Sequence, residues 1–106
     1  MSGWVRVCAT AELLPGEYRV VYDDNTPIAV FNVDGELYAI EDVCTHDGGE
    51  LTGGVVEGRE IECPRHGARF DLATGAALCA PAYEPTATFP VKVEDGVVYT
   101  RDDRRD

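Results

Sequence analysis

The chain has 106 residues, and its 9 Lys and Arg against 20 Asp and Glu give a formal net charge of −11 at pH 7. This length fits one small domain, and the negative charge disfavours binding to the phosphates of nucleic acid. No apolar run approaches the roughly 18 residues of a membrane helix, and the N-terminus lacks the basic start and apolar stretch of a signal peptide. We therefore expect a cytoplasmic protein that binds neither nucleic acid nor membranes.

Short β-rich segments separated by turn signals follow one another along the chain. They lie at residues 4–8, 18–22, 28–33, 36–40, 54–56, 60–63, 91–93 and 97–100. Asp34-Gly35 and Asp95-Gly96 each separate two of these segments, and Asp-Gly favours a type I′ hairpin because both central residues need a positive φ. Strands that recur every 8–12 residues or so predict an antiparallel sandwich or barrel. Helix is expected only as a single turn near Thr10.

The end of the chain differs from the rest. Residues 101–106 mix opposite charges and contain no apolar side chain to bury. We expect this tail to be frayed, as chain ends without packing often are, so that residues 1–100 form the single domain. Outside the motifs described next, Cys8 and Cys79 are expected to be small buried apolar side chains, and nothing in the sequence supports a disulfide between them.

Two loops contain both histidines of the chain and two of its four cysteines. The first reads Cys44-Thr45-His46-Asp47-Gly48-Gly49 and the second reads Cys63-Pro64-Arg65-His66-Gly67-Ala68, which gives C-x-H, then 16 residues, then C-x-x-H. Gly48 and Gly67 follow the histidines closely and allow a positive φ. In a reducing compartment, cysteines at this low density more often bind metal or act in catalysis than form disulfides.

The distribution of these four side chains indicates the kind of metal centre. Structural zinc sites usually pair Cys with Cys and His with His along the chain, whereas each loop here contributes one Cys and one His. Two cysteines on one iron and two histidines on the other make the ligand set of a Rieske 2Fe–2S cluster. A mononuclear zinc site, or unconnected core cysteines and surface histidines, are the alternatives.

From residue 4 to about residue 100 the sequence resembles Rieske-type ferredoxins, the small electron carriers of bacterial multicomponent oxygenase systems. The resemblance rests on the order of the four side chains and on the Cys-Pro-x-His-Gly run. Residues 78–82 more loosely resemble the proline loop that covers the cluster in this family. The resemblance implies an all-β fold, an antiparallel β-sandwich with a small cluster-binding subdomain inserted at about residues 43–82.

The resemblance also implies one Rieske 2Fe–2S cluster and assigns its ligands by position. The inner iron would be bound by Cys44 and Cys63, and the outer iron by the Nδ1 atoms of His46 and His66. The other edge of each imidazole would then face solvent.

Two departures from other Rieske proteins bear on the reduction potential. Rieske proteins of cytochrome bc complexes join their loops by a disulfide, whose two places are taken here by Gly49 and Arg65. High-potential members have a serine and a tyrosine that donate hydrogen bonds to sulfur, and Ala68 and Phe70 replace them here. Because such bonds stabilise the reduced cluster and the chain is strongly acidic, we expect a potential in the lower part of the Rieske range of about −150 to +300 mV.

The predicted function is one-electron transfer without catalysis. The chain would accept electrons from a flavin-dependent, NAD(P)H-oxidising reductase and pass them to a terminal non-haem iron oxygenase of the aromatic-ring dioxygenase type. With both histidines in the cluster, none remains for a 2-His-1-carboxylate iron site, and no G-x-G-x-x-G segment could hold flavin or nicotinamide. The alternatives are an accessory subunit of a nitrite reductase or iron–sulfur assembly system, and a zinc-stabilised binding module.

Partners are expected to dock around the exposed histidines, and the acidic surface would favour a basic partner. The predicted docking rim consists of Thr45, Asp47, Gly48, Pro64 and Arg65. A carrier that must visit two partners in turn is expected to be a monomer.

Overall fold

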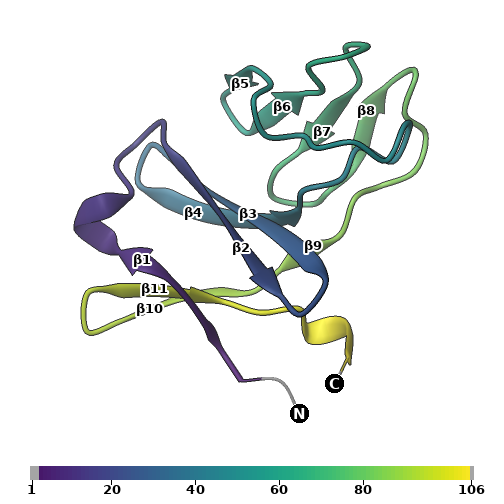
Figure 1. The fold of residues 1–106 in the computed structure, drawn as a ribbon. Helices are drawn as coiled ribbons and strands as arrows, with labels where there is room; N and C mark the ends of the chain where they lie inside the picture. The colour runs from purple at the N-terminus through teal and green to yellow at the C-terminus, as the bar shows by residue number, and fades with distance from the viewer. Residues whose placement is uncertain (1–2, 106) are drawn as a thin grey trace.

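The computed structural model describes residues 3–105, which are almost entirely strands and turns (Figure 1). The strands in this range are β1 (Val5–Ala9), β2 (Tyr18–Asp23), β3 (Thr26–Val33), β4 (Glu36–Glu41), β5 (Val56–Glu57), β6 (Glu60–Glu62), β7 (Arg69–Asp71), β8 (Ala77–Cys79), β9 (Thr88–Phe89), β10 (Val91–Glu94) and β11 (Val97–Thr100). Two short 3₁₀ turns, η1 (Thr10–Glu12) and η2 (Asp103–Arg105), complete the elements. None of the described helical segments has the length and apolar character needed to cross a membrane.

The strands form three antiparallel sheets, in the orders β1-β11-β10, β2-β3-β4-β9 and β5-β6-β7-β8. Figure 1 shows the second sheet between the other two. The third sheet is built from the chain between β4 and β9, so it is an insertion into the sandwich of the first two. This arrangement confirms the predicted all-β class, with antiparallel sheets and an inserted unit.

Strand β3 is buried on both of its faces, which explains its unbroken apolar sequence. Side chains alternate between the two faces of a strand, and Ile28 and Val30 lie in the core shared with the first sheet. Ala29 and Phe31 lie in the core shared with the third sheet and its loops. One strand therefore supports both halves of the molecule, including the loops that carry the predicted ligands.

The predicted hairpins are present. Asp34 and Gly35 have φ values of 52° and 94°, and Asp95 and Gly96 have φ values of 52° and 74°. These positive values confirm the type I′ signal, and the turns join β3 to β4 and β10 to β11. Strands β7, β8 and β9, each of two or three residues, were not predicted.

The prediction that the C-terminal tail has nothing to bury is wrong for Asp102, which is only 2% exposed. Its backbone N–H donates to Asp23 Oδ2 at 2.8 Å, and its own carboxylate accepts a 2.8 Å bond from the Thr26 hydroxyl. Arg104 donates to the same carboxylate from the η2 turn. The sequence showed only that no apolar group could be buried here, whereas a carboxylate can be buried once it is fully hydrogen-bonded.

The two cysteines outside the loops have different environments. Cys8 is buried, as predicted, within the core between the first two sheets. The same prediction is wrong for Cys79, which is exposed because β8 is an edge strand of the third sheet. Both are free thiols, so there is no disulfide between them.

Candidate metal centre

The first loop begins three residues after β4 and closes on itself through its own backbone. The Cys44 N–H donates to the Gly49 carbonyl at 2.7 Å, and the Gly48 N–H donates to the Cys44 carbonyl at 2.7 Å. Gly48 has a φ of 76°, which is where the chain reverses. A residue with a Cβ adopts this conformation only at a cost. The loop therefore has a fixed frame around its cysteine.

The second loop repeats this frame directly after β6. The Cys63 N–H donates to the Ala68 carbonyl at 2.6 Å, and the Gly67 N–H donates to the Cys63 carbonyl at 3.2 Å. Gly67 also has a φ of 76°. The two cysteines thus occupy equivalent positions in two equivalent loops, although the histidine follows its cysteine by two residues in the first loop and by three in the second.

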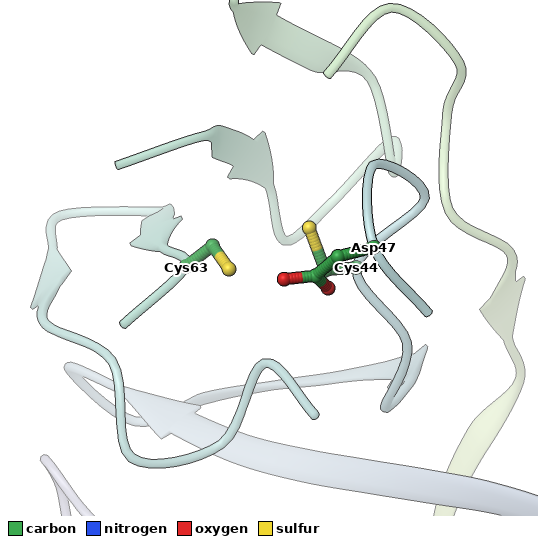
Figure 2. Close-up of side chains that lie close together, drawn as sticks. All are labelled: Cys44, Asp47 and Cys63. Carbon is green, nitrogen blue, oxygen red and sulfur yellow. The ribbon is translucent and has the colours of Figure 1, made fainter. Parts of the chain in front are cut away.

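The two cysteine side chains face each other in the interior between the loops. Cys44 and Cys63 are 0% and 1% exposed. Their sulfurs and a carboxylate oxygen of Asp47 all lie within 4.8 Å of one another, and Figure 2 shows Cys63 opposite Cys44 and Asp47. Burial raises the pKa of the Cys44 thiol, while the backbone N–H groups of His46 and Asp47 act in the opposite direction by favouring the thiolate.

The two histidines lie together at the surface. The ring centroids of His46 and His66 are 5.2 Å apart, and the planes meet at 86° in an edge-to-face contact. Both residues are exposed, and the side chain of His66 is 59% exposed. The centre is therefore layered, with two sulfur atoms inside and two imidazoles outside.

Asp47 and Arg65 form a two-pronged ion pair across the gap between the loops. The Arg65 Nε donates to Asp47 Oδ2 at 2.5 Å, and the Nη2 donates to Oδ1 at 3.0 Å. The guanidinium holds the pKa of the Asp47 carboxyl well below its usual range, and the carboxylate raises the pKa of Arg65. Asp47 Oδ2 also lies 3.9 Å from Nδ1 of His66.

The last residue of β8 contacts the second loop, and the segment after β8 contacts the first. The Thr45 hydroxyl donates a 2.6 Å hydrogen bond to the Glu84 carbonyl, and Cys79 Sγ lies 3.7 Å from the Gly67 carbonyl oxygen. Tyr83 is the neighbour of Glu84 and is 83% exposed. Accessible aromatic side chains are a feature of binding surfaces.

The donor set fits a 2Fe–2S cluster of the Rieske type. Two of the potential metal-binding groups in the described chain involve these residues, one with both sulfurs and one with both imidazoles. A dinuclear centre needs this separation, because the thiolates and the imidazoles bind different irons. Asp47 belongs to both groups, but its oxygens are occupied by Arg65 and by the Gly49 N–H.

Sequence reasoning singled out the four predicted ligands, which the structure brings together, but did not predict the contacts around them. The sequence did hold a signal for the Asp47–Arg65 pair, because each loop has a charged residue next to its histidine and the two charges have opposite signs. The Thr45–Glu84 bond had none, because its acceptor is a backbone carbonyl that any residue would supply.

Comparison with known families decides the identity of this centre. The Rieske [2Fe-2S] domain matches residues 3–90. The chain belongs to the Rieske family. A Rieske domain carries one 2Fe–2S cluster, so the predicted cofactor is confirmed, and the zinc-stabilised module is not supported.

Similar Rieske proteins are small ferredoxins. The ferredoxin component of the naphthalene 1,2-dioxygenase system of Pseudomonas putida is 42% identical over 92 residues, covering 87% of this chain and 88% of that protein. The solved Sphingomonas yanoikuyae B1 ferredoxin is 42% identical with a TM-score of 0.85, covering 94% of this chain and 99% of that one. A chain in a solved complex of reduced oxygenase and oxidized ferredoxin of carbazole 1,9a-dioxygenase is 39% identical with a TM-score of 0.87, covering 92% of each chain.

These likenesses confirm the predicted class of function. The Rieske chain is an electron-transfer component of the ferredoxin type and is not itself a catalytic subunit.

Proposed function

We propose that this Rieske protein carries single electrons from a flavin-dependent, NAD(P)H-oxidising reductase to a terminal non-haem iron oxygenase. In this proposal one iron is held by Cys44 and Cys63 and the other by His46 and His66. The observation that carries it is the layered arrangement of the site, with a buried sulfur pair beneath an exposed imidazole pair. When bound, the cluster supplies a centre that takes up and releases one electron.

The residues of the chain have distinct tasks in this proposal. Burial of Cys44 and Cys63 keeps water from the sulfurs. Burial also raises the pKa of the Cys44 thiol, and the backbone N–H groups of His46 and Asp47 offset part of that rise. The exposed imidazoles bring the electron within reach of a partner's surface. No substrate needs to enter, because the transferred species is the electron.

We propose that the partners bind to the face around the histidines. Asp47, Gly48, Pro64 and Arg65 of the predicted rim are exposed, and Thr45 is half-buried. We include Tyr83 in this proposal because it is 83% exposed and is the chain neighbour of Glu84, whose carbonyl accepts the Thr45 hydroxyl. Because the chain has a net charge of −11, attraction to a basic partner should weaken as salt is raised.

Cell location and oligomeric state are part of the same proposal. All four cysteines are free, which fits the reducing conditions of the cytoplasm. A monomer leaves the histidine face open to each partner in turn.

The ligand assignment is tested by iron content, colour and the EPR spectrum of the reduced protein. We expect a coloured protein with two irons per chain and a Rieske spectrum, all lost in Cys44→Ser and Cys63→Ser. The matched controls are Cys8→Ala and Cys79→Ser, which should keep the cluster. A colourless zinc protein, or retention of the cluster in the first two variants, would refute the assignment.

The carrier role is tested with purified partners. Rapid-mixing experiments should show the reduced protein being oxidised by a terminal oxygenase, at a rate that falls as the ionic strength rises. If it instead exchanged electrons only with a nitrite reductase or an iron–sulfur assembly system, the accessory-subunit alternative would replace this role.

A further inference from the structure

We propose that Asp47 and Arg65 are positioning residues whose ion pair ties the two ligand loops together and holds His46 and His66 side by side. The inference rests on the ligand assignment proposed above. All four cysteines of the chain are free, so the connection between the loops at this face is not a disulfide.

The first argument is the geometry of the pair. The fork of Arg65 meets both oxygens of Asp47, at 2.5 and 3.0 Å. Oδ1 of Asp47 also accepts the Gly49 N–H at 2.9 Å, so one carboxylate fixes its own loop and binds the other. Two-pronged pairs of this kind are stronger and more specific in direction than a single contact. The side chains of Arg65 and Asp47 are 36% and 21% exposed, so solvent screens part of their attraction.

The second argument is where the pair lies along the chain. Asp47 directly follows His46, and Arg65 directly precedes His66. The tie is therefore one residue away from each imidazole, and the two rings lie 5.2 Å apart. A change in the distance between Asp47 and Arg65 would be passed to the histidines with no intervening flexible segment.

The third argument is the space that Gly49 leaves for Arg65. A Cβ placed on Gly49 would lie 2.6 Å from Cζ of Arg65, too close for any real contact. Because the guanidinium is the far end of a flexible side chain, it would move away rather than the backbone. Because Gly49 has no Cβ, it leaves the space in which the Arg65 guanidinium reaches Asp47.

The tie has an electrostatic consequence that a purely mechanical contact would lack. Asp47 and Arg65 carry opposite charges, and each is next to one histidine in the sequence, so their fields oppose each other at the ligands. Removal of either charge alone should therefore shift the midpoint potential, and the two shifts should have opposite signs. Removal of both should leave the potential close to the starting value.

The test compares Asp47→Asn, Arg65→Gln, the double variant and the charge-reversed pair Asp47→Arg with Arg65→Asp, each loaded with cluster. We expect Asp47→Asn to raise the potential and Arg65→Gln to lower it. Each single variant should lose iron to a chelator about fivefold faster, an effect of the size of one ion pair. The double variant should lose iron equally fast at nearly normal potential, and the charge-reversed pair should restore resistance to the chelator.

Two further variants distinguish the mechanical connection between the loops from the effect of the charges on the potential. Gly49→Ala keeps both charges but displaces the fork, so it should speed iron loss without either potential shift. Arg65→Lys keeps the charge without the fork and should give the same result. The matched control is Glu94→Gln, which breaks the Lys92–Glu94 pair on β10, at 3.7 Å, and should change neither property.

The inference is overturned if the single variants lose iron at the normal rate, or if the charge-reversed pair loses it as fast as the singles. It is also overturned if both single variants shift the potential in the same direction. These outcomes are distinct from failure of the proposed function, because that failure appears in the unmodified protein as the absence of a Rieske EPR spectrum.

Discussion

The Thr45 hydroxyl donates a 2.6 Å hydrogen bond to the carbonyl of Glu84, 39 residues further along the chain. This bond joins the first ligand loop to the segment that follows β8. Cys79, the last residue of β8, contacts the second loop, where its Sγ lies 3.7 Å from the Gly67 carbonyl oxygen. Residues between Cys79 and Glu84 therefore run from the second loop to the first.

Replacement of Thr45 by Val should loosen this segment while preserving the shape of the side chain. Loss of one hydrogen bond of this type costs about 1 kcal/mol, so local opening of residues 80–86 should become roughly fivefold more frequent. Hydrogen exchange measured on peptides from this region would show the change. The control is Thr88→Val, the same replacement at an exposed position of β9. Equal exchange in both variants would contradict the role of the Thr45 hydroxyl.

Gly75 anchors the far end of the same segment, because its carbonyl accepts the Thr86 N–H at 2.8 Å. It has a φ of 78°, and a Cβ there would lie 2.1 Å from the Thr86 carbonyl oxygen. Gly75→Ala should therefore lower the free energy of unfolding through backbone strain and through a clash with backbone, together by about 2–5 kcal/mol.

Gly96→Ala is the matched control for this prediction. Its φ of 74° is nearly the same, but a Cβ there would meet nothing within 4 Å. Gly96→Ala should lower the free energy of unfolding only through backbone strain, by about 1–2 kcal/mol. Urea denaturation of the two variants would measure the difference, and equal losses would mean that the contact with Thr86 is unimportant.

Much of the fold was predictable because local chemistry decided it. The Asp-Gly turns specified two hairpins, and β3 could be recognised from its apolar run. Strands β7 to β9 were not recognised in the sequence, and β9 pairs with β4, which is distant along the chain. The burial of Asp102 was also hidden, since it depends on Asp23 and Thr26 from the other end of the domain.

In the candidate site, too, some features could be predicted from local sequence and others depend on how distant segments pack. The four predicted ligands were singled out because metal chemistry restricts both residue type and spacing, and the structure brings their side chains together in two pairs. Their layering, with sulfur inside and imidazole outside, is a property of the packed loops and was available from the sequence only through resemblance. Contacts such as Asp47–Arg65 require the relative placement of two loops, which spacing along the chain does not give.

The reduction potential should respond to a single hydroxyl at Ala68. Ala68 is fully buried, and its carbonyl accepts the N–H of Cys63. In Ala68→Ser the new hydroxyl can donate to sulfur, which would favour the reduced state and raise the midpoint potential. Protein-film voltammetry would compare the midpoint potential of Ala68→Ser with that of Ala68→Gly, which adds no donor.

A midpoint potential of the unmodified protein above about +150 mV would contradict the low-potential prediction.

The carboxyl of Asp102 should make stability depend on pH. Its hydrogen bonds with Arg104 are the main cause of its lowered pKa, and Thr26 contributes. A group whose pKa is lower in the folded state stabilises the fold above its unfolded pKa of about 3.9, and the contribution disappears as the pH falls through the folded value.

Asp102→Asn should therefore lower the free energy of unfolding by about 1–2 kcal/mol at pH 7, the value for hydrogen bonds to a charged group reduced by the exposure of Arg104. The loss should shrink as the pH falls below about 4, where the unmodified protein begins to lose the same contribution. Urea denaturation at pH 7 and pH 3 would measure both effects, and the exposed neighbour Asp103→Asn is the control. A loss for Asp102→Asn that stays constant over this range would show that the side chain stabilises the tail by shape and not by its charge.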